Sequence, residues 1–535
     1  MALTTSHWPA DTSVPVLAQT VGGLLREAAA EEGDKQALIS VAPDRAARTW
    51  TYRELLSDAE HAAAWLLDRF EPGEAVVVWA PNVPEWVVLQ YGAALAGLVL
   101  VTANPALRGP ELAHVLNSSG ATAVFFVGSF RGTDMAGLVD AVLPGAPGVR
   151  ESVTLEGWLD EVRATARRSA LPDVDPESAT QIQFTSGTTG PAKPAVLSHL
   201  AMVTNAAYVR ARCGAPFGAT YVTALPLFHT AGCGLAGLGS VHQRATLVLG
   251  ELFDPATLIA AIAEYRGVAF GGVPAMLHAM LAYPASAETD LSSLEVIMTG
   301  GDAVPPALID GWTRRYGVRA SAVYGQTELS PIICQTSPDD DRADNLGTAG
   351  RPLPNVEVAI VVPGTAQITP VGVEGEICAR GYQAMQGYLG LPEETARTID
   401  ADGWVHTGDL GTMDARGYVT VTGRLKNLII RGGENIHPRE VEEALIEHPA
   451  IANATIVGLP DPAWGETVAA VLQLDPERPA PSADDLRTFV RERLSPQKTP
   501  TSWYVTGDLP VNAMGKLQRF RLREHIDAGR LSPLT

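Results

Sequence analysis

The sequence predicts an α/β fold with a large N-terminal domain and a smaller C-terminal α+β domain. From about residue 15 to 350, short apolar runs alternate with helical patterns, which favours largely parallel sheets covered by helices. Between residues 351 and 423, short strands with Gly, Pro and Asp turns replace this alternation. A mixed helix and strand pattern follows residue 424. We therefore expect domains at residues 1–424 and 425–535, with a β-rich subdomain at about 351–423.

The individual elements follow from apolar periodicity. Strands are expected at residues 74–80, 122–127, 181–184, 221–225, 245–249 and 294–299, and helices at 55–70, 255–265 and 305–316. The apolar stretch at residues 87–103 contains Gln90, Tyr91 and two glycines, so we expect a buried helix leading into a buried strand and no membrane span. In the C-terminal part, Pro438 with Glu440 close behind predicts the start of a helix.

Composition narrows the class of protein. The chain has 535 residues, of which 46% are hydrophobic and 19% charged, as expected for a globular protein with several structural units. A net charge of −21 argues against nucleic acid and anionic membranes as partners. The four cysteines include no C-x-x-C pair, so neither a zinc site nor a redox pair is indicated. With no signal peptide evident at the N-terminus, we expect a cytoplasmic protein with reduced thiols.

A segment rich in glycine and hydroxyl groups follows the strand expected at residues 181–184 and ends at Lys193. Backbone N–H groups and hydroxyls can surround an anion, and a lysine then neutralises its charge. The spacing G-x-x-G-x-x-K differs from a Walker A motif, and an ordinary Ser/Thr-rich turn is the alternative. The candidate phosphate-binding residues are Thr185, Ser186, Gly187, Thr188, Thr189 and Lys193.

Further motifs carry groups that a nucleotide would need. Tyr324 offers a flat face for a purine, and Glu328 offers a hard oxygen for Mg²⁺, although a helix-capping Thr-Glu pair is the alternative. Asp409 could accept hydrogen bonds from both hydroxyls of a cis-diol. Lys516 near the C-terminus could bridge two anions in a transition state, or could simply be a solvated lysine.

These motifs, in this order, resemble those of the adenylate-forming superfamily of acyl-CoA synthetases, adenylation domains and luciferases. The resemblance extends from about residue 20 to 525 and is greatest to bacterial fatty-acyl or aryl-CoA ligases. It implies a large domain of αβαβα sheets, a small β-barrel subdomain and a mobile C-terminal lid that turns at Lys426. It also implies that Gly301, Asp302, Tyr324, Gly325, Gln326, Thr327, Asp409 and Arg424 contact the nucleotide, that Glu328 holds Mg²⁺, and that Lys516 is catalytic.

The acyl pocket is expected around His229 and the glycines at 232, 234, 237 and 239. By the resemblance, His229 lies at the inner end of this pocket, although a core histidine is the alternative. The glycines indicate either room for a substrate or tight helix packing. Gly432 and its neighbours would line the pantetheine path. No aspartate of the kind used by amino-acid-activating domains occurs in this segment, so a free α-amino acid is not expected.

The resemblance implies an acid–thiol ligase that uses ATP, Mg²⁺ and CoA. A carboxylic acid would become acyl-AMP and then acyl-CoA, in a protein that is a monomer or homodimer. Two departures from the family pattern leave alternatives open: Asp302 where alanine is usual, and Pro194 where glycine is usual. These alternatives are loading of a carrier protein and activation of nitrite to diazotise an amino-aryl acid. Non-catalytic nucleotide binding is a separate alternative, and the presence of Lys193, Glu328, Asp409 and Lys516 argues against it. Asp302 is either a surface or capping carboxylate, or a polar contact to an amino or hydroxyl substituent on the substrate.

Overall fold

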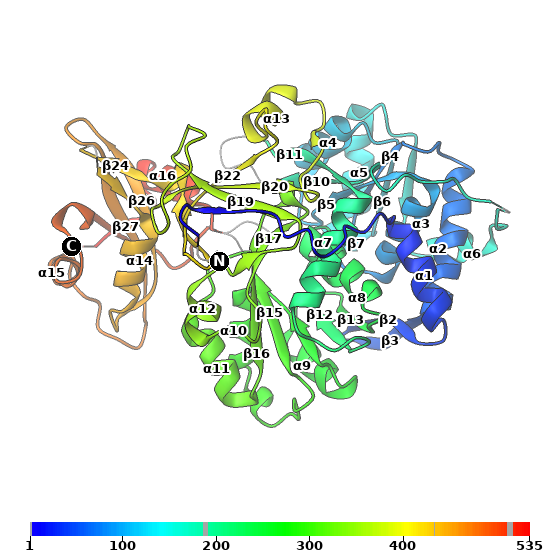
Figure 1. Cartoon of the computed structure of the whole chain (residues 1–535), viewed down its shortest axis with the longest axis horizontal. Coiled ribbons are helices and arrows are strands. Elements are labelled where there is room, and N and C mark those ends of the chain that lie inside the picture. Colours follow the sequence, from blue (N-terminus) through cyan, green and yellow to red (C-terminus); the bar gives the residue numbers. More distant parts are fainter. Residues whose placement is uncertain (1–2, 169, 186–190, 433, 511–516, 535) are drawn as a thin grey trace.

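The structure is a computed structural model that describes residues 3–168, 170–185, 191–432, 434–510 and 517–534. Two large sheets form the N-terminal body, and a separate sheet forms the C-terminal end. Figure 1 shows the elements from β24 (Ile429–Arg431) onward, in orange and red, at one end of the long axis. The expected α/β class with a smaller C-terminal domain is therefore confirmed, whereas the boundary after residue 424 stays a prediction.

The first large sheet has seven strands, and those at its centre are parallel. In spatial order they are β21 (Gly387–Tyr388), β11 (Lys193–Ser198), β10 (Ala179–Thr185), β5 (Val99–Ala103), β4 (Ala75–Trp79), β6 (Ala123–Phe126) and β9 (Glu151–Thr154). Only β11 and β21 run antiparallel to their neighbours. The sequence did not predict β11, which begins at Lys193 and pairs antiparallel with β10.

The second large sheet has nine strands. In spatial order they are β18 (Arg351–Pro352), β17 (Ile332–Gln335), β16 (Arg319–Gly325), β15 (Val296–Gly300), β14 (Ala269–Gly271), β12 (Tyr221–Thr223), β13 (Leu247–Gly250), β2 (Gln36–Ala42) and β3 (Arg45–Thr51). The run from β16 to β2 is parallel. Ligands in such sheets bind beyond the carboxyl ends of the strands. The Tyr324 segment ends β16, and the Gly301 segment follows β15.

The helices cover these sheets. The main ones are α1 (Val21–Glu32), α2 (Tyr52–Leu67), α3 (Pro84–Ala96), α4 (Gly109–Ser119), α7 (His199–Arg212), α9 (Pro255–Glu264), α10 (Pro274–Ala282) and α11 (Pro306–Tyr316). α2 starts at a capping box in which Thr51 and Glu54 satisfy each other's backbone N–H groups. α3 followed by β5 is the buried helix and strand expected at residues 87–103. Within the described ranges, no helix is long and apolar enough to cross a membrane.

A five-stranded antiparallel sheet lies between the body and the C-terminal end. It contains β1 (His7–Trp8), β19 (Val356–Val361), β20 (Gly375–Gly381), β22 (Val405–Met413) and β23 (Val419–Arg424). The C-terminal sheet contains β24, β25 (Glu434–Ile436), β26 (Ile451–Asp461), β27 (Gly465–Leu474), β28 (Ser502–Val505) and β29 (Ser532–Pro533). α14 (Pro438–Ile446) begins at Pro438 as expected, and it packs with α15 (Ala483–Arg491).

Candidate active site

Asp409 lies at the middle of β22 and is 3% exposed. Its Oδ2 accepts a hydrogen bond of 3.0 Å from the Tyr324 hydroxyl, and its Oδ1 pairs with Arg424 Nε at 2.6 Å. Asp409 and Arg424 are cross-strand partners, whereas Tyr324 comes from the second large sheet. The structure thus brings together three residues that the sequence assigned to the nucleoside. Each carboxylate oxygen has two acceptor positions, so capacity remains for a ribose cis-diol.

Burial and the Asp409 carboxylate raise the pKa of Tyr324 well above its ordinary value. The phenol therefore stays protonated and keeps donating to Asp409. This holds the Tyr324 ring in a fixed position beside the carboxylate.

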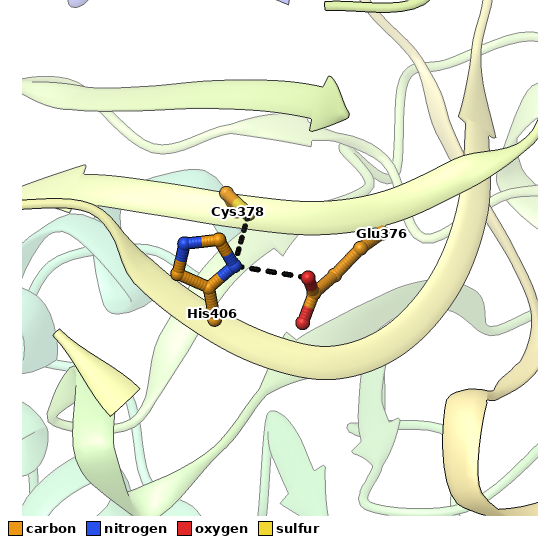
Figure 2. A group of neighbouring side chains, drawn as sticks. All are labelled: Glu376, Cys378 and His406. Carbon is orange, nitrogen blue, oxygen red and sulfur yellow. Dashed lines mark hydrogen bonds and ion pairs between the residues drawn. The ribbon is translucent and has the colours of Figure 1, made fainter. Parts of the chain in front are cut away.

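A second network supports the turn before Asp409 (Figure 2). Glu376 Oε1 accepts a bond of 3.1 Å from the N–H of Gly408, a residue with φ of +69°, and Glu376 Oε2 lies 2.9 Å from His406 Nδ1. Cys378 Sγ lies 3.4 Å from the same nitrogen. A glycine suits this left-handed conformation. No role for His406 was expected from the sequence.

Glu376, Cys378 and His406 could in principle hold a metal ion, because their ligand atoms lie within 4.8 Å of one another. Their side chains already hydrogen-bond to one another, as Figure 2 shows. Burial, with Glu376 and Asp400 nearby, raises the pKa of the Cys378 thiol, whereas a metal needs the thiolate. We therefore interpret this group as a hydrogen-bonded support for the Asp409 turn.

Lys193 and Glu328 lie on two sides of Tyr388. The Tyr388 hydroxyl donates to Glu328 Oε1 at 2.7 Å, and Lys193 Nζ lies 5.1 Å from the centroid of the Tyr388 ring. Lys193 is the cross-strand partner of Thr185, and it forms an ion pair with Glu394. The expected phosphate lysine and the expected magnesium carboxylate are thus joined by a tyrosine that carried no motif signal. Of the other loop candidates, Ser186, Gly187, Thr188 and Thr189 lie outside the described residues.

The Gly301 and Gly325 segments follow neighbouring parallel strands. Gly301 has φ of +81°, and a Cβ on Gly325 would lie 1.9 Å from the Pro331 carbonyl oxygen, so this backbone approach requires glycine. Gln326 and Thr327 are half-buried beside it. Asp302 is exposed, and its Oδ1 accepts from the N–H of Ala303 at 2.8 Å. This bond goes to the next residue and does not cap α11, whose N-cap Pro305 has no side-chain hydrogen bond. The exposed position fits a surface carboxylate, and a substrate contact of Asp302 stays a prediction.

His229 lies directly before the π-helix η2 (Ala231–Leu238) and its Nδ1 accepts a bond of 3.2 Å from the N–H of Ala231. π-helical turns are rare and often occur at functional sites. A Cβ on Gly232 would lie 2.1 Å from the Pro226 carbonyl oxygen, and one on Gly239 would lie 2.4 Å from Arg210 Cγ. At these two positions glycine therefore serves close packing rather than open space.

In the C-terminal part, Lys426 is exposed in the short turn η5 (Leu425–Asn427). Gly432 has φ of +60°, and a Cβ there would lie 2.8 Å from the ring of Trp464. Contacts from α14 reach the β-rich subdomain, since His437 Nε2 lies 3.2 Å from Glu374 Oε1. Lys516 lies outside the described residues, so its catalytic role and the hinge at Lys426 stay predictions.

Comparisons with known proteins agree with this geometry. Residues 25–389 match the model of the AMP-binding enzymes, and residues 440–516 match the C-terminal domain of those enzymes. The chain is 35% identical to an acyl-CoA synthetase of Bacillus subtilis, YngI, with 94% of this chain and 96% of that protein covered. It is 30% identical to the mitochondrial medium-chain acyl-CoA ligase ACSF2 of Rattus norvegicus, with 98% and 90% covered.

Among solved structures, ATP-bound MatB from Rhodopseudomonas palustris superposes with a TM-score of 0.86 at 27% identity, covering 95% of this chain and 100% of that one. The expected type of enzyme, an AMP-forming ligase that activates an acid with ATP and transfers it to CoA, is confirmed by these relatives. Matches to the models of both domains lead to one conclusion: this chain belongs to the family of AMP-binding enzymes.

Proposed function

We propose that this chain converts an aliphatic carboxylic acid into its acyl-CoA, through an acyl-AMP that remains bound. The observation that carries this proposal is the convergence of Tyr324 and Arg424 on Asp409, together with the contacts of Tyr388 to Lys193 and Glu328. The first group offers a carboxylate that can bind a ribose and an aromatic ring that can stack on a purine. The second provides a cation, Lys193, and a carboxylate, Glu328, which follows Tyr324 by four residues in the chain.

In this proposal Asp409 accepts hydrogen bonds from the ribose hydroxyls, and Lys193 contacts the phosphates. Glu328 fits a magnesium site, because it is a half-buried carboxylate whose Oε1 is held by Tyr388 while lone pairs remain for a hard cation. Bound Mg²⁺ would neutralise part of the negative charge of the phosphates. Gly301, Gln326 and Thr327 line the same strand ends and are proposed to contact the nucleotide.

The second half of the reaction is proposed to use the C-terminal domain differently. Lys516 would stabilise the joining of two anions during adenylation. A turn at Lys426 would then withdraw Lys516 and bring Gly432 toward the adenylate, so that the CoA thiol can attack and AMP can leave. The exposed position of Lys426 at the end of β23, between two separate sheets, supports this turn. The four buried free cysteines support a reducing, cytoplasmic location.

The aliphatic acid is supported by two observations. The π-helix after His229, where the acyl pocket is expected, consists of Ala, Gly, Leu and Cys and carries no charged side chain. The Rattus norvegicus relative is named for medium-chain acids. We therefore propose an acid of medium chain length.

The test is a panel of acids, from short to long aliphatic chains and including aryl and amino-aryl acids, with pyrophosphate release as the readout. We expect the enzyme to release pyrophosphate from ATP most efficiently with medium-chain acids. We expect sustained turnover to require CoA. Lys516→Ala should lose pyrophosphate release but still bind ATP. If only amino-aryl acids with nitrite, or only a carrier protein, sustain turnover, the proposed acceptor or acid is wrong. Wild-type pyrophosphate release by Lys516→Ala would contradict the catalytic role of that lysine.

A further inference from the structure

The phosphate-loop lysine already has a carboxylate partner. Lys193 Nζ pairs with Glu394 Oε2, and Glu394 lies in the first turn of α13 (Pro392–Thr398). The fold explains the contact: β21 pairs with β11, so the chain leaves β21 beside Lys193 and enters α13 at once. The two residues are 201 positions apart in the sequence.

Glu394 has a second cationic partner in its own helix. Its Oε1 contacts Arg397, three residues further along α13. If the contact with Lys193 breaks, Glu394 therefore still has an ion pair with Arg397. Lys193, in turn, keeps its position over the Tyr388 ring when Glu394 leaves, because that contact comes from β21.

The Glu394 carboxylate and the phosphates of a nucleotide would compete for Lys193, because both are negatively charged. A nucleotide triphosphate brings several negative charges to the ammonium, and a carboxylate at the same ammonium would repel them. The side chains of Lys193 and Glu394 are 32% and 31% exposed, so water screens their ion pair and keeps it weak. The pair is thus readily exchanged for a polyphosphate.

We propose that Glu394 is the resting counter-ion of Lys193, and that the phosphates of the incoming nucleotide displace it toward Arg397. Glu394 is then a positioning residue that orders the lysine before binding and lowers the apparent affinity for ATP. This inference rests on the proposed phosphate contact of Lys193. It adds a residue that no motif in the sequence identified.

The test is isothermal titration of MgATP into the full-length protein and its variants, with adenosine as a ligand that lacks phosphates. Glu394→Gln should bind MgATP about two- to fivefold more tightly, in the range expected for removal of a competing surface ion pair. Its affinity for adenosine should equal that of the wild type. Glu393→Gln is the matched control, because Glu393 precedes Glu394, contacts Arg397 at 3.4 Å and is 87% exposed. We expect no change in this control.

A double variant completes the design. In a Lys193→Met background, Glu394→Gln should no longer alter the affinity for MgATP, because the lysine for which Glu394 competes is gone. The proposal is overturned if Glu394→Gln binds MgATP no more tightly than the wild type. It is also overturned if Glu394→Gln raises the affinity for MgATP equally in the Lys193→Met background. Failure of the proposed function is distinguishable, because a wild type that binds MgATP but releases no pyrophosphate with any acid contradicts that function alone. A wild type that does not bind MgATP overturns both.

Discussion

Asp409→Asn should weaken the binding of ATP and AMP by about 30-fold or more while the protein stays folded. Asp409 is 3% exposed, so water cannot replace a lost hydrogen bond there. Hydrogen bonds to a charged group contribute about 1.5–3 kcal/mol each, and a neutral bond contributes about 1 kcal/mol. The amide keeps one oxygen acceptor, so one ribose bond is lost and the other becomes neutral. The lost bond costs about 1.5–3 kcal/mol and the weakened bond about 0.5–2 kcal/mol, so together these changes come to about 2–5 kcal/mol.

The assay is equilibrium binding of ATP and 2′-deoxy-ATP to the wild type and to Asp409→Asn. In the wild type, removal of the 2′-hydroxyl should cost affinity, and in the variant it should cost little, since the charged acceptor is gone. Asp400→Asn is a suitable control, because Asp400 lies 3.5 Å from His406 Nε2 in the same region but does not face Tyr324 or Arg424 in the described contacts. If removal of the 2′-hydroxyl costs the same binding free energy in Asp409→Asn as in the wild type, Asp409 does not contact that hydroxyl.

Three other predictions concern stability and metal use. Burial lowers the pKa of His199 from 6.5 to about 4, so the folded state holds a neutral imidazole. The unfolded chain takes up a proton at His199 below pH 6.5, so the free energy of unfolding should fall by about 3 kcal/mol between pH 6.5 and pH 4. Urea unfolding should therefore depend less on pH in His199→Gln, and identical pH profiles would argue against this. Gly232→Ala should cost about 1–3 kcal/mol of stability, read as a lower melting temperature, because its Cβ would lie 2.1 Å from a carbonyl oxygen. The matched Gly237→Ala, whose Cβ meets its nearest atom at 3.4 Å, should cost less. Tyr388→Phe should raise the Mg²⁺ concentration for half-maximal pyrophosphate release about two- to tenfold, because Glu328 loses a neutral hydrogen bond, and an unchanged requirement would count against that support.

Local pattern predicted the elements well, because short apolar runs between turns form buried strands in any α/β protein. The strand expected at residues 294–299 is β15 (Val296–Gly300), and the helix expected at 305–316 is α11 (Pro306–Tyr316). Boundaries were less accurate where a side chain ends the element. β12 stops at Thr223 rather than at residue 225, since the Thr223 hydroxyl accepts the N–H of Leu225 at 2.9 Å.

The sequence by itself determined the fold class, the family and the order of the nucleotide-binding motifs, because these depend on periodicity and on residue types at fixed spacing. It left open whether the glycines after His229 make room or pack tightly, and only the three-dimensional neighbours of Gly232 and Gly239 decided for tight packing at those two positions. The roles of Tyr388 and Glu394 were also invisible in the sequence. Their contacts with Glu328 and Lys193 arise from the pairing of β21 with β11, which joins segments about two hundred residues apart. Local sequence does not encode such pairing, since it depends on the order of strands in the completed sheet.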